Sequence, residues 1–442
     1  MWRPAKRILG QHHPALTGFN MDLKQRVVVT GIGVVSSIGV GKHKFINSIL
    51  EGRSGIKRIS SFDASSYPTQ VAGEIQDFDP VDFMPQKIAR RMDRSSQMIL
   101  ASATMAVEDA KMESGVDRSR VGVFTGTAVG GQAWAFREYE KFKEKGIRRI
   151  NPFTAIATFP NASSAQISTR FGFKGPSDTL SSGCVSSTVA LGYALDNLRC
   201  GRLEVALVGG TEAPLDPGIF GAYCAARVMT SETQNPSRVP RPFDLGRNGI
   251  VLSEGAAVLV CETLLHASAR NARIYAEIAG WYHNSDSFSM MMLNPDGVQV
   301  EAVMRGALLD AGISAGEIEY IQTHAAGTVF DDPIEAAALQ RVFGEGIDTI
   351  PVVSIKSLIG HTQGACGAIE ATAAALTMHK RVIPRSINCD DLDPRCRLHV
   401  NRETVLHRPI RALLLNTFGF GGKNASIILR AILERSPQMV RT

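Results

Sequence analysis

Short apolar runs that lead directly into glycine recur along this chain, and they constrain its fold more than any other feature. The first is RVVVTGIGVVSSIG at residues 26–39, and RVGVFTGTAVGG (120–131) and EVALVGGTEA (204–213) repeat the pattern. Such runs predict buried strands that end in loops. Residues 90–110 space their apolar positions as a helix does. Alternating strands and helices predict an α/β fold with central buried sheets.

The second part of the chain repeats this pattern at residues 318–328, 351–361 and 412–422. Gly183-Cys184 and Gly360-His361 also resemble each other, because each pair precedes a stretch rich in alanine, glycine and small polar residues. After His361 the small residues recur at near-helical spacing, which suits backbones that approach closely. We therefore expect two pseudo-duplicated halves, at residues 23–270 and 271–432, with an N-terminal extension at 1–22 and a tail at 433–442.

The composition is that of a globular protein that needs no disulfide or metal support. The 442 residues are 44% hydrophobic and 20% charged, with a net charge of +6. The seven cysteines are scattered and form no CxxC pair, which disfavours a disulfide framework and a zinc site and favours a reducing, cytoplasmic compartment. The dispersed basic residues make nucleic acid a poor partner but suit an acidic carrier protein. No apolar stretch approaches the roughly 20 residues of a membrane span.

The first twenty residues contain Arg3, Lys6 and Arg7 and no acidic residue, which is one property of a transit peptide. They contain no serine, and their apolar stretch is too short for a secretory signal. We therefore favour an extension of a cytoplasmic protein over organellar targeting.

Cys184 is a candidate nucleophile because small residues surround it and a helical pattern begins just after it. The N–H groups and the dipole at a helix N-terminus favour a thiolate, and the same N–H groups can hold an oxyanion. A covalent acyl-cysteine intermediate is the chemistry that this setting suits. The alternative is an inert buried thiol.

Two histidines stand beside small residues at the ends of expected strands, His324 in QTHAAGTVFDDPIE and His361 in IKSLIGHTQGACG. Loops at strand ends are where α/β sheets bind ligands, so this pair favours a catalytic role over a structural one. Lys356 on its own would be an ordinary solvated lysine. Asp332 and Glu335 would by default cap the helix that opens at DDPIEAA.

The stretch NTFGFGGKNAS (416–426) places Phe418 and Phe420 among glycines. It is either a tight turn with a buried aromatic or a movable gate whose N–H groups complete an oxyanion site.

Eight motifs in this order resemble the elongating β-ketoacyl-acyl-carrier-protein synthases and the related ketosynthases of polyketide assembly. The resemblance covers residues 25 to 430 and rests on VVVTGIGVVSSIG, RRMDRSSQM, SSGCVSST, VGGTEA, RPFD…RNGIVLSEGAAVLV, THAAGTVFDDPIEAAA, SIKSLIGHTQGACGAIE and NTFGFGGKNASIIL. It implies a thiolase-like fold of five αβαβα layers, made of two pseudo-duplicated halves and usually dimeric. It also implies a decarboxylative Claisen condensation between malonyl-carrier protein and a cysteine-bound acyl chain, in fatty-acid or polyketide biosynthesis.

The resemblance assigns a role to each matching residue. Cys184 takes the acyl chain from phosphopantetheine, the substrate arm of acyl carrier protein, and no other cofactor is implied. His324 and His361 bind the malonyl thioester and promote its decarboxylation, in an undecided division of labour. Lys356 and its ion-pair partner Glu335 organise the site. The remaining assignments are the oxyanion hole at the N–H groups of Cys184 and Phe420, the gate at Phe420, and substrate contacts at Thr328, Val129, Tyr223 and Phe418.

The chain departs from the family pattern at several positions. Ala326 stands where a hydroxyl commonly helps to hold pantetheine, which leaves Thr328 for that role. Gly183 replaces the usual alanine before the cysteine, and Lys423 stands where threonine is common. The motif DDPIEAA is closer to polyketide ketosynthases than to fatty-acid ones.

Three other functions compete with this one. A noncatalytic, chain-length-setting subunit of a heterodimer would typically lack the nucleophile, whereas Cys184, His324, His361 and Lys356 are all present. A degradative thiolase would carry a second cysteine near residues 418–424, and an initiating synthase would use asparagine in place of one histidine. A homodimer is expected, with a heterodimer as the alternative, and residues 155–166 suit a dimer surface.

Overall fold

The computed structural model describes residues 26–112 and 116–432 of the chain. The expected N-terminal extension, the targeting segment at 1–20 and the tail at 433–442 lie outside the described residues. Among the described residues, no helix is long and apolar enough to cross a membrane.

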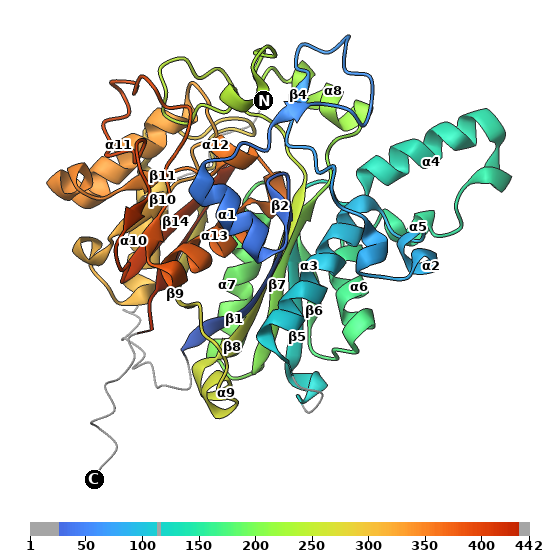
Figure 1. The fold of residues 1–442 in the computed structure, drawn as a ribbon, viewed down its shortest axis with the longest axis horizontal. Helices are drawn as coiled ribbons and strands as arrows, with labels where there is room; N and C mark the ends of the chain where they lie inside the picture. Colours follow the sequence, from blue (N-terminus) through green and yellow to red (C-terminus); the bar gives the residue numbers. More distant parts are fainter. Residues whose placement is uncertain (1–25, 113–115, 433–442) are drawn as a thin grey trace, which may run out of the picture.

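Each of the predicted apolar runs contains a buried strand, and the strands form two sets of five (Figure 1). The first set comprises β1 (Val27–Ser36), β5 (Val121–Gly126), β6 (Ser177–Leu180), β7 (Val205–Glu212) and β8 (Gly255–Thr263). The second set comprises β9 (Ala276–Ser285), β10 (Tyr320–Gln322), β11 (Val352–Val353), β14 (Ala412–Gly419) and β15 (Lys423–Arg430).

The two sets have the same topology. The spatial order is β6-β5-β7-β8-β1 in the first and β11-β10-β14-β15-β9 in the second, so both run third, second, fourth, fifth, first. In each set only the fifth strand, β8 or β15, is antiparallel to its neighbours. The shared order and orientation confirm a pseudo-duplicated α/β fold.

The sets join where β1 pairs with β9 through Val27–Val29 and Ala276–Ile278. Away from this junction α7 (Ser186–Arg199) and α13 (Cys366–Lys380) lie between them, each in contact with strands of both sets (Figure 1). Helices α3 (Arg94–Ala110) and α6 (Ala162–Phe171) cover the outer face of the first set, and α10 (Val298–Ala311) and α11 (Asp331–Phe343) that of the second. This arrangement gives the predicted five layers.

The small residues of α13 have the predicted effect. An added Cβ on Gly367 would lie 2.0 Å from Thr188 Oγ1 of α7, so the central helices pack too closely for a larger side chain there. Residues Cys366 to Met378 are all buried as a result.

The helix predicted at 90–110 begins at Arg94, because the Asp93 carboxylate caps it by accepting from the N–H groups of Ser95 (2.8 Å) and Ser96 (3.3 Å).

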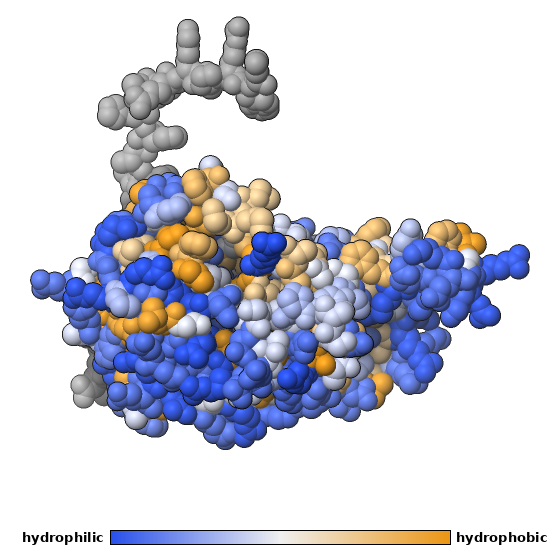
Figure 2. All heavy atoms as spheres, turned by 90° about the horizontal axis from the view of Figure 1, so that it is seen from above, coloured by the Kyte–Doolittle hydropathy of each residue, from blue (hydrophilic) through white to orange (hydrophobic). Residues whose placement is uncertain are grey.

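Helix α4 (Gln132–Lys145) projects from the body, and hydrophilic side chains cover most of this arm (Figures 1 and 2). The other helices of at least four residues and the remaining strands are β2 (Gly39–Val40), α1 (Lys42–Glu51), β3 (Lys57–Arg58), β4 (Val71–Ala72), α2 (Gln86–Ala89), α5 (Thr154–Ala157), α8 (Pro217–Ala225), α9 (Leu264–Ala269), α12 (Lys356–Ile359), β12 (Val382–Ile383) and β13 (Leu406–His407).

Candidate active site

A cavity of about 550 Å³ lies where loops from both halves meet. Most of the candidate residues from the sequence line it, namely Cys184, Tyr223, His324, Thr328, His361, Phe418 and Phe420. Lys356 and Glu335 are buried behind its wall. Val129 does not line this cavity, and its N–H donates to Glu212 Oε1 instead (3.0 Å), so the geometry gives no support to its predicted place in the acyl pocket.

Cys184 lies two residues before α7, as the sequence predicted, and it is partly accessible from the cavity. Its electrostatics differ from the expectation of a thiolate. Burial raises the pKa of the Cys184 thiol to about 12, and the N–H of Phe420 and the charge of Lys356 only partly oppose this effect. The substrate-free enzyme therefore holds a thiol, which must lose its proton during acyl transfer.

The stretch around Phe420 is a β-hairpin rather than a long flexible loop. Residues 416–419 of β14 pair with 423–426 of β15, so only Phe420, Gly421 and Gly422 form the turn. A Cβ added to Gly419 would lie 3.0 Å from Cys184 Cβ, which shows how closely the hairpin packs on the nucleophile. Phe418 is buried and Phe420 half-buried, so the tight-turn interpretation holds for the backbone. The backbone N–H groups of Phe420 and Cys184 both stabilise the charged form of the Cys184 sulfur. An oxyanion hole must bind the carbonyl oxygen of the acyl group rather than this sulfur, so its assignment to these two N–H groups stays a prediction.

His361 follows α12 and presents a fixed tautomer. Its Nδ1 accepts the N–H of Gln363 (3.0 Å), and the Cys366 sulfur lies 3.2 Å from the same nitrogen. Because Nδ1 is an acceptor, the neutral ring carries its proton on Nε2. Burial, assisted by the charge of Lys356, lowers the pKa of His361 to about 3. His361 is therefore a neutral hydrogen-bond donor at physiological pH.

His324 follows β10, and its ring meets that of His361 edge to face at a centroid distance of 5.4 Å. Its Nδ1 is buried and has no hydrogen-bond partner among the described residues. Burial and the charge of Lys356 lower the pKa of His324 well below the usual value, so this ring is also neutral.

Lys356 is 2% exposed and forms an ion pair with Glu370 of α13, which corrects the predicted pairing with Glu335. Burial alone would lower the pKa of Lys356, but Glu370 holds it above the usual value, so the ammonium stays charged. The sequence carried a signal for Glu370, because it is the only acidic residue in α13 and is surrounded there by small and apolar residues.

Glu335 of α11 supports the loop that carries His324. Its carboxylate accepts the N–H groups of His324 (3.0 Å) and Ala325 (2.8 Å) and the side-chain amide of Asn416 (3.1 Å). Burial raises the pKa of Glu335 to about 7 in spite of these donors. Glu335 thus connects β14, α11 and the His324 loop.

Both halves of the chain match known proteins. Residues 24–267 match the N-terminal domain of beta-ketoacyl synthase, and residues 275–390 match its C-terminal domain. The chain is 35% identical over 412 residues to 3-oxoacyl-[acyl-carrier-protein] synthase 2 of Coxiella burnetii, which covers 93% of this chain and 100% of that protein. The chain belongs to the beta-ketoacyl synthase family.

Two solved ketosynthases share the fold of this one. A type II polyketide acyl-carrier protein in complex with its ketosynthase, bound to the hexaketide, matches with a TM-score of 0.86 and 30% identity over 92% of this chain and 99% of that one. The ishigamide ketosynthase/chain length factor matches with a TM-score of 0.86 and 32% identity over 93% of this chain and 100% of that one.

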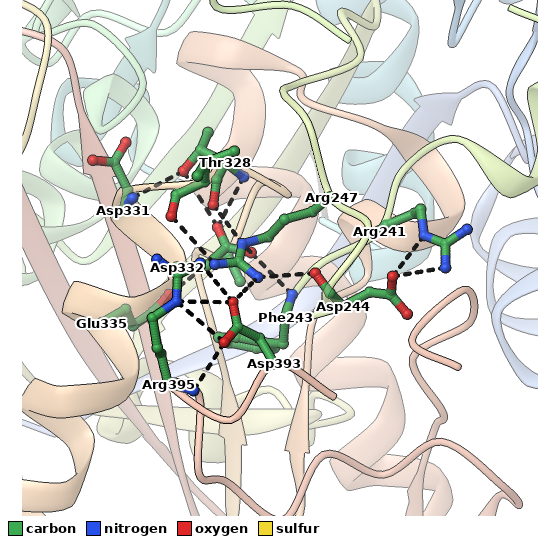
Figure 3. Close-up of polar contacts among 12 residues, drawn as sticks. Arg241, Phe243, Asp244, Arg247, Thr328, Asp331, Asp332, Glu335, Asp393 and Arg395 are labelled. Atoms are coloured by element: carbon green, nitrogen blue, oxygen red, sulfur yellow. Dashed lines mark hydrogen bonds and ion pairs between the residues drawn. The ribbon is translucent and has the colours of Figure 1, made fainter. Parts of the chain in front are cut away.

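In this ketosynthase a buried arginine network, which the sequence analysis did not predict, holds the loop after His324 (Figure 3). Arg247 donates from Nε to the Thr328 carbonyl (2.7 Å) and from Nη1 to Asp393 (2.7 Å). Asp332 accepts the N–H of Thr328 (3.1 Å) and that of Phe243 (3.0 Å). The Thr328 hydroxyl accepts the N–H of Asp331 (3.1 Å), so both the backbone and the side chain of Thr328 are held by hydrogen bonds.

Glu212, at the end of β7, is a second buried acid that the sequence analysis did not single out. It accepts the N–H groups of Ala128 (2.7 Å), Val129 (3.0 Å) and Gly364 (2.9 Å). It therefore ties the loop after β5 in the first half to the turn after His361 in the second. A lone glutamate after a buried strand, in VGGTEA, was the available signal.

Proposed function

We propose that this ketosynthase lengthens a carrier-bound acyl chain by two carbons as a 3-oxoacyl-[acyl-carrier-protein] synthase. The proposal rests mainly on one observation, which is that a single cavity is lined by Cys184, His324, His361 and Phe420. A thiol nucleophile, two neutral imidazoles and an oxyanion hole are the groups that acyl transfer and decarboxylation need.

In the first step Cys184 attacks the thioester carbonyl of the incoming acyl chain. The carbonyl oxygen becomes an oxyanion that the N–H groups of Cys184 and Phe420 bind. The carbon–sulfur bond to phosphopantetheine breaks, and the thiol proton passes to the departing carrier thiolate. An acyl-cysteine and a free carrier thiol result.

In the second step malonyl-carrier protein enters the same cavity. The Nε2–H of His361, together with His324, binds the malonyl thioester oxygen and stabilises the enolate that forms as CO₂ leaves. The enolate carbon attacks the acyl carbonyl, the bond between that carbon and the Cys184 sulfur breaks, and the released thiolate takes up a proton from water. Burial, assisted by the charge of Lys356, lowers the pKa of both histidines and keeps them neutral, so the base form of each ring is available.

The test is acylation of the purified chain, followed by intact-mass measurement. We expect wild type to gain the mass of one acyl group and Cys184→Ala to gain none. Cys200→Ala is the matched control, because Cys200 is exposed and lies outside the cavity. Acylation of Cys184→Ala at the wild-type rate would contradict the proposal.

The alternative is a noncatalytic, chain-length-setting subunit, and the geometry of Cys184 argues against it. Incubation of the chain alone with acyl-carrier protein and malonyl-carrier protein separates the two. Formation of 3-oxoacyl product by the chain alone supports the enzyme. If product forms only after a second subunit is added, the same mixture with Cys184→Ala decides, because product that still forms without Cys184 supports the noncatalytic subunit.

The partners of this site follow from its shape and position. The phosphopantetheine arm of an acyl carrier protein would enter along Thr328, and the exposed Arg227 at the cavity lining would attract the acidic carrier. A homodimer would form on the edge strand β6 and would also cover the exposed Ile156 and Phe159. Light scattering of wild type and of Phe159→Glu tests the dimer, which the variant should weaken.

A further inference from the structure

Gln363 is a polar residue of the cavity to which the proposed reaction gives no task. It stands two residues after His361, lines the cavity and is only 1% exposed. Its backbone has a φ of +45°, a conformation that a side chain other than glycine rarely adopts. The N–H of Gln363 donates to His361 Nδ1 (3.0 Å), and the N–H of Gly364 donates to Glu212 (2.9 Å). The surrounding structure thus holds this residue in place against local strain.

The amide group of Gln363 is unpaired. Neither Oε1 nor Nε2 has a hydrogen-bond partner among the described residues, although both atoms are buried. The Tyr223 hydroxyl is nearby: burial raises the pKa of Tyr223, and a weak hydrogen bond with the Gln363 amide opposes that rise. This contact falls short of the distances and angles of an ordinary hydrogen bond, and it engages the amide at one atom at most. A buried amide without partners is unfavourable, and each such group in a native protein calls for an explanation.

The space beside this amide belongs to the substrate. Tyr223, Cys184 and Gln363 line one cavity, and the backbone N–H of Gln363 lies 3.0 Å from Nδ1 of His361, so the amide lies near the thioester end of a bound acyl chain. Several other lining residues, such as Ile250, Leu293 and Phe418, are apolar. A saturated chain would satisfy those residues and leave the amide unpaired.

We propose that Gln363 binds an oxygen atom on the acyl chain, so that the preferred substrate is an oxygenated acyl group, 3-oxo or 3-hydroxy, rather than a saturated one. This proposal rests on the proposed ketosynthase function and specifies its substrate class. Nε2 donates to the carbonyl or hydroxyl oxygen of the chain. Oε1 accepts from a substrate hydroxyl or from Tyr223 when the ring shifts to meet the bound chain.

The expected discrimination follows from the cost of leaving the amide unpaired. A site built around a polar group rejects an analogue that lacks the matching group more strongly than an apolar pocket rejects an added methylene. We expect an oxygenated chain to acylate Cys184 about 10- to 100-fold faster, as kcat/KM, than a saturated chain of equal length. Gln363→Leu should bring this ratio close to one, mainly by accelerating the saturated chain.

The experiment uses the full-length protein and three thioesters of the same chain length, which are 3-oxoacyl, 3-hydroxyacyl and saturated. Acylation of Cys184 is followed by intact mass for wild type, Gln363→Leu and Gln363→Asn. The asparagine variant keeps the amide and should retain part of the preference. Gln234→Leu makes the same exchange at an exposed position outside the cavity and should behave as wild type.

The outcomes distinguish this proposal from the function on which it rests. Acylation by all three thioesters at equal rates in wild type would overturn the role of Gln363 and leave the ketosynthase function intact, as expected if ordered water satisfies the amide. Acylation by none of them would count against the function itself. A preference for only one of the two oxygenated chains supports the proposal and identifies the group that Gln363 binds. The comparison of oxygenated with saturated chains is made on the wild-type protein. The test therefore remains decisive even if a Gln363 variant fails to fold.

Discussion

In each half of this ketosynthase a glycine with a positive φ precedes a candidate catalytic residue, and the two residues have different chemistry. Gly183 precedes Cys184 with a φ of +64°, and Gly360 precedes His361 with a φ of +72°. In the first half α7 begins two residues after the cysteine, whereas in the second half a turn at Gln363–Ala365 separates His361 from α13. The duplicated scaffold therefore places a nucleophile and a proton donor at matching positions, and the added turn supplies Gln363.

The largest expected effect separates the roles of the two halves. His361→Ala should lower condensation about 1,000-fold, because the enolate loses its donor, while Cys184 still accepts an acyl group. Product formation and intact-mass acylation, measured on the same preparation, check this. If His361→Ala also abolished acylation, the division of labour between the halves would be wrong.

The two glycines differ in how tightly they are packed. An added Cβ on Gly360 would lie 2.3 Å from Ser253 Oγ and 2.8 Å from the Val251 carbonyl. We expect Gly360→Ala to cost about 3 kcal/mol in the free energy of unfolding, from overpacking and the positive φ together. Chemical denaturation at fixed protein concentration measures it. Gly312→Ala is the control for backbone strain alone, because Gly312 has a φ of +66° and no atom lies within 4 Å of its added Cβ. If Gly312→Ala lost as much free energy of unfolding as Gly360→Ala, close packing would not explain the effect at Gly360.

The neutral histidines make stability depend on pH. His361 has a folded pKa of about 3, below its ordinary 6.5, so its contribution is present above pH 6.5 and is lost as the pH falls toward 3. Between pH 7.5 and pH 5 this group should remove about 2 kcal/mol from the free energy of unfolding. The free energy of unfolding of His361→Asn should fall by about that much less over the same pH range. His407→Asn changes an exposed histidine and should show the same pH dependence as wild type. If His361→Asn also showed the wild-type pH dependence, the assignment to His361 would be wrong.

Gly183→Ala should have the smallest effect. The nearest atom to its added Cβ is the Phe420 carbonyl oxygen at 3.3 Å, which requires only a slight adjustment. We expect a loss of about 1 kcal/mol, mostly from the positive φ, with acylation of Cys184 retained within a few-fold. A loss as large as that of Gly360→Ala would show that the two positions are equally constrained.

Local patterns predicted the elements well and the interactions between elements poorly. Six of the strands were readable because each lies in a short apolar run that leads into glycine, and α13 was readable because its small residues recur with helical spacing. The hairpin at Phe420 was not, because glycine-rich sequence allows a loop and a tight turn equally, and only the pairing of β14 with β15 decides between them.

The sequence by itself determined the alternation of strands and helices, the two-fold repetition and, through motif resemblance, the residues that meet at the cavity. Only the tertiary structure decided that Lys356 pairs with Glu370, that Arg247 holds the Thr328 loop and that the Gln363 amide is left unpaired. It also decided how deeply Cys184 is buried, which raises the pKa of its thiol instead of lowering it as the sequence predicted. The physical reason is that ion pairing, desolvation and unpaired polar atoms depend on the neighbours that each side chain meets across the fold, which local spacing does not encode.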